Sequence, residues 1–176
     1  MQLNLTKAER AEFRTILRGW ADAPVALQMQ NYIQHGSVNT YEHCMSVAQT
    51  SFWLARRFGL AVDEVSMVRG ALLHDFYLYD WHDCAHITRL HGFNHPAIAL
   101  KNAERCYPLN DIERDVIRNH MWPLTLLHAP ATREAAIVCF ADKLCSTKET
   151  VLERRRKHAN VREKIRAVQA LQKAKT

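Results

Sequence analysis

The chain has 176 residues, long enough to bury one hydrophobic core, and its 48% hydrophobic and 24% charged residues are typical of a globular protein. No run approaches the roughly 20 apolar residues that span a bilayer, and the first residues lack the layout of a signal peptide, so we expect no membrane partner. Five cysteines, odd in number and without a CxxC pair, favour reduced thiols and a cytoplasmic protein.

The net charge of +6 is concentrated at the C-terminal end. Residues 148–176 hold 10 basic and 3 acidic residues, whereas residues 1–147 hold 14 basic and 15 acidic ones. We therefore divide the chain into a domain at residues 1–150 and a basic helical tail at residues 151–176. Such a tail could steer an anionic partner such as a nucleic acid, but a solvated terminal helix is the favoured interpretation.

Helix signals begin close to the N-terminus, and strand signals are nearly absent. Thr6, with Glu9 three residues later, forms a capping box that predicts a first helix running towards Trp20. Pro24 lies near a helix start and Gly36 just past its end, which predicts a second helix between them.

Two more helices are expected over residues 39–59, where Gly59 provides a stop, and over residues 62–75. After an irregular stretch, Asn94 is a candidate cap for a further helix with Pro96 in its first turn.

The last two expected helices complete an all-α fold. Asn110 and Glu113 form another capping box, whose helix Pro123 breaks. Residues 132–157 read as a long helix whose apolar spacing fades into charge. Without linkers or repeats, the sequence predicts a single compact helical bundle with a long basic C-terminal helix.

Six ionisable residues have apolar neighbours at helical distance and lie at the ends or inner faces of these helices: His43, His74, Asp75, His95, His120 and Asp142. A lone histidine in such a place is more often a core residue bonded to a carbonyl, and Asp142 alone could pair with Lys143. Burying all six separately is costly, however. Convergence on divalent metal ions would satisfy them together, because imidazole and carboxylate are natural ligands of such metals.

The order of these residues resembles a known family. His43 in "YEHCMSVA", His74 and Asp75 in "ALLHD", and Asp142 in "CFADK" match the H…HD…D motif of the HD-domain metal-dependent phosphohydrolases. The resemblance covers roughly residues 30–150. It implies that these four residues bind a divalent metal inside an all-helical fold.

Two further histidines look like the additional ligands of binuclear branches of that family, which include bacterial dinucleoside tetraphosphate hydrolases and HD-GYP cyclic dinucleotide phosphodiesterases. By this analogy His95 in "HPAIAL" and His120 in "VIRNHMW" would complete a second metal, with Asp75 as the bridge. One or two ions of Fe, Mn, Co, Ni or Zn suit such ligands. Neither a GYP motif nor the Gly-Lys that often follows the HD pair is present, which favours a phosphomonoester or anhydride over a cyclic dinucleotide.

The resemblance implies hydrolysis of a small, nucleotide-like phosphate ester or anhydride by hydroxide formed at the metals. Asp75 is then both a ligand and a catalytic residue. His91 and Lys143 are the favoured candidates to protonate the leaving oxygen or to offset phosphate charge, with Arg89 and Asp80 as alternatives.

Other features leave several interpretations open. His35 could line the mouth of the site, and a group of aromatic residues could stack on a base, although core positions are favoured for them: Phe76, Tyr77, Tyr79, Trp81 and Trp122. The alternatives to a small-molecule phosphohydrolase are a nuclease or cyclic nucleotide phosphodiesterase and a non-catalytic module that binds a nucleotide or a protein. The long terminal helix could also pack against a partner chain in a homo-oligomer.

Overall fold

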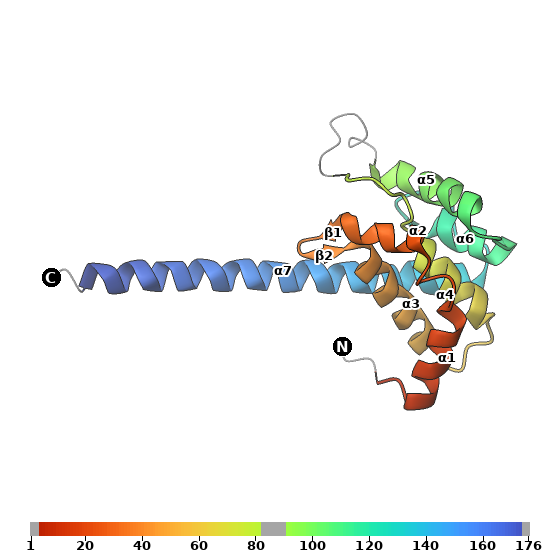
Figure 1. Cartoon of the computed structure of the whole chain (residues 1–176), viewed down its shortest axis with the longest axis horizontal. Helices are drawn as coiled ribbons and strands as arrows, with labels where there is room; N and C mark the ends of the chain where they lie inside the picture. The colour runs from red at the N-terminus through yellow and green to blue at the C-terminus, as the bar shows by residue number, and fades with distance from the viewer. Residues whose placement is uncertain (1–3, 82–90, 174–176) are drawn as a thin grey trace.

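The computed structural model of the chain describes residues 4–81 and 91–173, with the side chains of His35, His91 and residues 163–173 left undescribed. Within these ranges the fold is an all-α bundle with one small hairpin, as predicted (Figure 1). The elements are α1 (Lys7–Leu17), α2 (Pro24–Leu27), the 3₁₀ helix η1 (Gln28–Asn31), β1 (Ile33–His35), β2 (Val38–Asn39), α3 (Thr40–Arg57), α4 (Glu64–Leu73), α5 (His91–Cys106), α6 (Asp111–Asn119) and α7 (Arg133–Lys173).

Reciprocal side-chain caps begin several of these helices. At α1 the Thr6 hydroxyl accepts from the backbone of Glu9 at 3.2 Å, and the Glu9 carboxylate accepts from the backbone of Thr6 at 2.7 Å. Asn110 and Glu113 make the same exchange at α6, also as predicted. A third capping box at Asn39 starts α3. Each cap satisfies backbone donors that a helix start leaves unpaired.

The helix predicted between Pro24 and Gly36 is wrong in its second half. Helix α2 ends at Leu27, and after η1 the strand β1 pairs antiparallel with β2. Gly36, with φ of +63°, lies in the hairpin turn instead of after a helix. A helix C-terminus and a hairpin turn both commonly use a glycine with positive φ, so the glycine alone does not distinguish the two.

Helix α5 begins at His91, three residues before the predicted cap at Asn94. Pro96 therefore lies inside the helix, at its sixth residue, where its missing N–H removes the hydrogen bond that this position would donate to the carbonyl of Gly92. The expected helices at α3, α4 and α6 end close to their predicted stops, and Gly59 has the positive φ of a helix stop.

Four helices pack in a closed circuit, α3 on α4, α4 on α6, α6 on α7 and α7 on α3, while α5 packs on α6. The interior of this circuit holds buried side chains such as Phe52, Met67, Leu72 and Ile117. Complete burial of each stabilises the fold by about 1.5–3 kcal/mol. Gly70 allows α4 and α6 to approach closely, because a Cβ at this position would lie 2.8 Å from Cβ of Val116.

The C-terminal half of α7 projects from the bundle (Figure 1). The helix crosses residue 150 without a break, so the boundary between domain and tail stays a prediction. Within the described ranges, no helix combines the length and the apolar character needed to cross a membrane. Cys44, Cys106, Cys139 and Cys145 are free thiols, and Cys84 lies outside the described residues.

Candidate metal centre

The packing of the helices brings the six predicted ligands together in the interior, where all are buried. They come from five helices or from the residue or two directly after them: His43 of α3, His74 and Asp75 after α4, His95 of α5, His120 after α6 and Asp142 of α7. Each of the four circuit helices thus contributes at least one side chain to the same buried cluster, and α5 adds His95.

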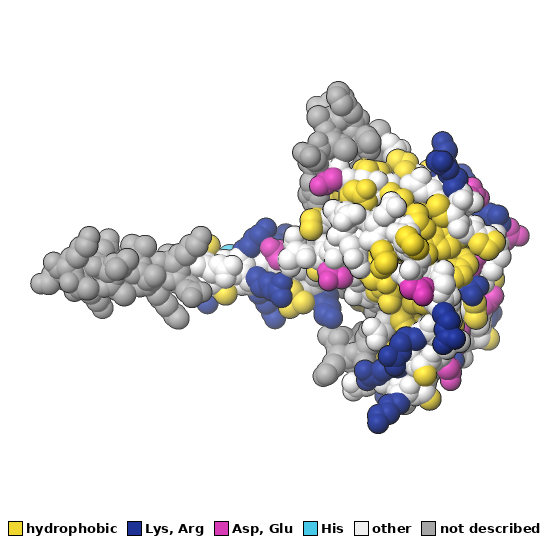
Figure 2. Space-filling model, viewed as in Figure 1, with side chains coloured by type: hydrophobic (Ala, Val, Ile, Leu, Met, Phe, Trp, Pro, Cys, Tyr) yellow, Lys and Arg dark blue, Asp and Glu magenta, His cyan; other side chains and the backbone are white. Residues whose placement is uncertain are grey.

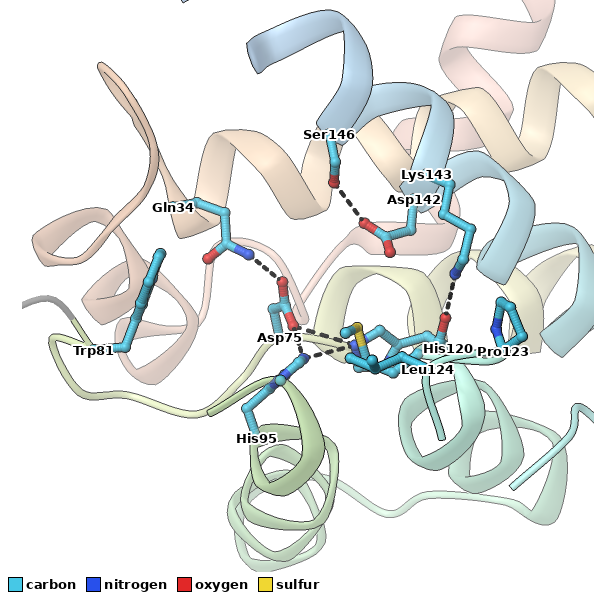
Figure 3. A pocket seen from close by; sticks show the side chains of 12 residues that line it. Gln34, Asp75, Trp81, His95, His120, Pro123, Leu124, Asp142, Lys143 and Ser146 are labelled. Carbon is cyan, nitrogen blue, oxygen red and sulfur yellow. Dashed lines mark hydrogen bonds and ion pairs between the residues drawn. The ribbon is translucent and has the colours of Figure 1, made fainter. Parts of the chain in front are cut away.

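The Asp75 carboxylate lies between Gln34 on one side and His95 and His120 on the other (Figure 3), and each of its two oxygens is close to two histidines. Oδ2 lies 3.4 Å from Nε2 of His74 and 3.9 Å from Nε2 of His43. Oδ1 lies 3.1 Å from Nε2 of His95 and 3.4 Å from Nε2 of His120. A single carboxylate between two sets of imidazoles is the arrangement of a bridging ligand.

Asp142 completes the set around His43 and His74. Its Oδ1 lies 3.1 Å from Nε2 of His43 and 3.9 Å from Nε2 of His74. Two groups in the described residues therefore have donor atoms close enough to hold an ion: His43, His74 and Asp142, and His74, Asp75 and His120. The groups share His74, so the two candidate sites are adjacent.

Hydrogen bonds at the far side of the rings fix which nitrogen faces the cluster. Nδ1 of His74 donates to the carbonyl of Ala71 and Nδ1 of His120 to that of Ile117, each at 2.8 Å. A carbonyl only accepts, so Nδ1 carries the proton and the lone pair of Nε2 points inward. Such outer contacts orient metal-ligating histidines.

The donor set fits a divalent transition metal. Nε2 of His74 and Oδ1 of Asp75 are buried and have no hydrogen bond of normal geometry among the described residues, a costly state that a cation would relieve. Nε2 of His95 also lies 2.9 Å from Nε2 of His120, a contact that needs a shared proton or a shared cation.

The electrostatics favour the ionised carboxylate. Burial opposes ionisation of Asp75, but the neighbouring His74 and His95 hold its pKa well below the usual range. Burial lowers the pKa of His120 and so favours the neutral, ligating imidazole. At His43, burial is outweighed by hydrogen bonds to Asp142 and Glu149, which raise the pKa to about 10.

A cavity of about 620 Å³ opens onto the cluster, a size suited to a small-molecule ligand. We call it the site pocket. Asp75, His95, His120 and Asp142 lie in its wall, together with mainly apolar surface from residues such as Trp81 and Leu124 (Figure 3).

The aromatic residues after Asp75 divide between core and pocket. Phe76 and Tyr77 are buried, as favoured, and only Trp81 of the five candidates lines the site pocket among the described residues. Trp122 is 42% exposed and lines a separate apolar pocket.

Lys143 reaches the wall of the site pocket, but its ammonium group is engaged. It donates to the carbonyl of His120 at 2.9 Å and to that of Cys139 at 3.2 Å, and thereby ties α7 to the end of α6. The His91 side chain lies outside the described part of the chain, as do the side chain of His35 and all of Arg89. Their roles stay predictions, and Asp80 is not among the described residues that line the pocket.

Three polar residues that the sequence analysis did not single out contact the ligands. Gln34 donates to Oδ2 of Asp75 at 2.6 Å, Ser146 donates to Oδ1 of Asp142 at 3.1 Å, and Glu149 bonds Nδ1 of His43 at 2.9 Å. Ser146 and Glu149 follow Asp142 by four and seven residues, a spacing that puts all three on one helix face. That spacing could have revealed them.

Comparison with known proteins gives one match. The family model described as HD domain matches residues 40–147, a range that contains all six predicted ligands. Gln34 and Glu149 lie just outside it on either side. No curated protein and no solved structure matches the chain.

Proposed function

The chain belongs to the HD domain family, and on that premise we propose that it is a metal-dependent phosphohydrolase acting on a phosphate ester or anhydride of a small, nucleotide-like molecule. Members of this family are generally metal-dependent hydrolases. The observation that carries the proposal is the Asp75 carboxylate, whose two oxygens face two different pairs of histidines at the wall of the site pocket.

Two adjacent ions are proposed. His43, His74, Asp75 and Asp142 would hold one, and Asp75, His95 and His120 would hold the other, with Asp75 shared. The division is supported by the distances around each Asp75 oxygen, and the donor group of His43, His74 and Asp142 supports the first site. The second donor group joins Asp75 and His120 but also includes His74. Bound divalent cations supply Lewis-acid chemistry, which activates water and withdraws charge from phosphate oxygens.

The protein's own residues prepare this chemistry. The carbonyls of Ala71 and Ile117 retain the Nδ1 protons of His74 and His120, so that Nε2 of each ring stays available. Lys143 contributes a positive charge at the pocket wall. Its ammonium already donates to two carbonyls, so we propose that it offsets phosphate charge and does not act as the proton donor.

The shape of the site pocket supports a substrate with an apolar part beside its phosphate. Four of the proposed ligands line the pocket, and Trp81, Met121 and Leu124 add apolar lining. A nucleobase is planar and can stack on an indole ring, which suits this combination. The complete set of six ligands favours an enzyme over a module that binds without turnover.

The test is a panel of phosphorylated compounds assayed with protein reloaded with Fe, Mn, Co, Ni or Zn. We expect phosphate release from at least one nucleotide with at least one metal, and none from the variant Asp75→Asn. Absence of turnover for every compound and metal, in protein whose metal content elemental analysis has verified, would overturn the proposal.

A further inference from the structure

The site pocket continues into a second hollow along α7. This hollow has a volume of about 270 Å³ and is lined by Gln34, Gly36, Trp81, Thr150, Glu153, Arg154 and Lys157. Gln34 and Trp81 also line the site pocket, so the two spaces meet at these side chains. We call the second hollow the basic groove.

The hairpin and α7 form the walls of the basic groove and are tied together. Arg156 donates to the hydroxyl of Ser37 in the hairpin turn at 2.9 Å. Glu153 packs so closely on Gly36 that a Cβ at position 36 would lie 2.5 Å from Cγ of Glu153. The groove is therefore built by specific contacts between two segments, not by a helix lying alone in solvent.

The positive charges of the basic groove make few ion pairs or hydrogen bonds with the described residues. Arg154 makes no hydrogen bond or ion pair with any described residue, and Lys157 contacts only the Glu153 carboxylate, at 3.7 Å, with its side chain 73% exposed. Figure 2 shows Lys and Arg side chains gathered where α7 leaves the bundle. Clustered charge beside a low-dielectric wall attracts anions.

The position of the groove indicates which anion it would receive. Arg154 follows Asp142 by twelve residues on the same helix, which places their backbones roughly 18 Å apart along its axis. The Arg154 side chain spans only part of this distance, so a phosphate that it holds is offset along α7 from one held beside Asp75. Gln34 and Trp81, where the two spaces meet, lie on one side of Asp75 (Figure 3).

From these observations we infer that the basic groove binds a second phosphate of the substrate, remote from the one that is hydrolysed. The inference rests on the proposed function of the site pocket and narrows the substrate class. It favours compounds that carry a second phosphate displaced from the reacting one, as a short single-stranded oligonucleotide does. Arg154 and Lys157 pair with the remote phosphate, while Trp81 contacts the part between.

The experiment compares two double variants with the same change in charge. Arg154→Gln with Lys157→Gln removes the groove cations, and Lys148→Gln with Arg155→Gln removes two exposed cations of α7 that do not line the groove. Binding of a fluorescently labelled short oligothymidylate to metal-loaded protein is measured by anisotropy at several salt concentrations. Unlabelled dinucleoside tetraphosphate, whose phosphates form one continuous chain, serves as the competitor for comparison.

We expect the groove variant to bind the oligothymidylate about fivefold more weakly than the control variant does. For the oligonucleotide, the magnitude of the slope of log affinity against log salt should fall by about 0.7, the value for one lost phosphate contact on a single strand. Glu153→Gln, which removes the one negative charge of the groove, should act in the opposite direction.

Kinetics distinguish failure of this inference from failure of the proposed function. The KM of a two-phosphate substrate, relative to that of a nucleoside monophosphate, should rise about fivefold in the groove variant only. Equal KM ratios, affinities and salt slopes in the two double variants would overturn the proposed phosphate binding in the basic groove. The proposed hydrolase activity would be unaffected by that result. Binding that depends on Arg154 and Lys157 without turnover of any substrate would overturn the hydrolase instead.

Discussion

His43 and Glu149 are 106 positions apart in the sequence and share a hydrogen bond of 2.9 Å between Nδ1 and Oε2. The bond makes Glu149 an outer partner of a proposed metal ligand, because it fixes the ring and leaves Nε2 directed at Asp142 and Asp75. Glu149 lies beyond residue 147, where the match to the HD domain family ends. The centre therefore depends on a part of α7 that the family pattern does not cover.

The first prediction concerns this outer partner. Replacing Glu149 with Ala should weaken binding of the first metal roughly 10- to 100-fold, because the His43 ring loses its orientation and the electron-donating carboxylate. Glu149→Gln should restore part of the affinity, since its amide oxygen still accepts from Nδ1. Competition titration with a coloured chelator measures the affinity. Glu153→Ala removes the same charge one turn further along α7 and should have no effect on it; equal losses in both variants would refute the assignment.

The second prediction concerns the number of ions. Wild-type protein saturated with metal should hold two per chain, and His120→Ala should hold one, because His43, His74 and Asp142 remain as a complete set. Elemental analysis after removal of loose metal gives the count. His128→Ala, which removes an exposed histidine outside the cluster, should keep both ions. Two ions retained by folded His120→Ala would show that the second site is placed wrongly.

Local signals in the sequence were sufficient for most helices. Thr6 and Asn110 have their capping partners three residues away, so the information that starts each helix is contained within one turn. The ligand cluster could also be predicted from the sequence. Few arrangements can bury so many ionisable side chains on helices, and the H…HD…D order restricts these arrangements further. The structure brings all six predicted ligands together, although their binding of metal awaits the tests above.

Long-range contacts decided what could not be predicted. Gln34 lies in a segment with helical signals, yet its amide donates to Asp75 and its oxygen accepts from Tyr77, both more than 40 positions away. The backbone of Thr40 donates to the carbonyl of Tyr32 at 2.8 Å, which holds the hairpin against the start of α3. Such tertiary contacts override weak local propensity. Gln34 reaches the centre from the hairpin and not from a ligand-bearing helix, so no helical spacing in the sequence connects it with the ligands.

The third prediction is that metal supports the fold as well as the chemistry. Removal of metal should leave the buried carboxylates and imidazoles of the centre without a shared cation and should lower the unfolding temperature. An ion present at about 1,000 times its dissociation constant stabilises the native state by roughly 4 kcal/mol. Thermal melts followed by circular dichroism, with and without chelator, measure the shift.

The control for this effect is Asp75→Asn, which lacks the proposed bridge. Its melting temperature should respond much less to chelator than that of the wild type. If chelator leaves the wild-type unfolding temperature unchanged, the cluster is a self-contained hydrogen-bonded network, and the proposed metal ligation would have to be abandoned.

The last prediction concerns the contact between α4, which ends just before His74 and Asp75, and α6, which ends just before His120. Gly70 on α4 faces Val116 on α6, and a Cβ at position 70 would lie 2.8 Å from Cβ of Val116. Gly70→Ala should therefore destabilise the fold by about 1–3 kcal/mol, although alanine favours a helix more than glycine does. The strain should also shift the end of α4, and with it Asp75, relative to His120.

A double-mutant cycle separates this clash from a general loss of packing. Val116→Ala alone creates a cavity and destabilises the protein, but in combination with Gly70→Ala it removes the two Val116 methyl groups that would lie 2.9 and 3.2 Å from the new Cβ, while the contact of 2.8 Å between the two Cβ atoms stays. Urea titrations should give a combined loss smaller than the sum of the two single losses by at least 0.5 kcal/mol. Strict additivity would show that α4 and α6 do not press on each other at this point, and that their separation is set elsewhere in the circuit of helices.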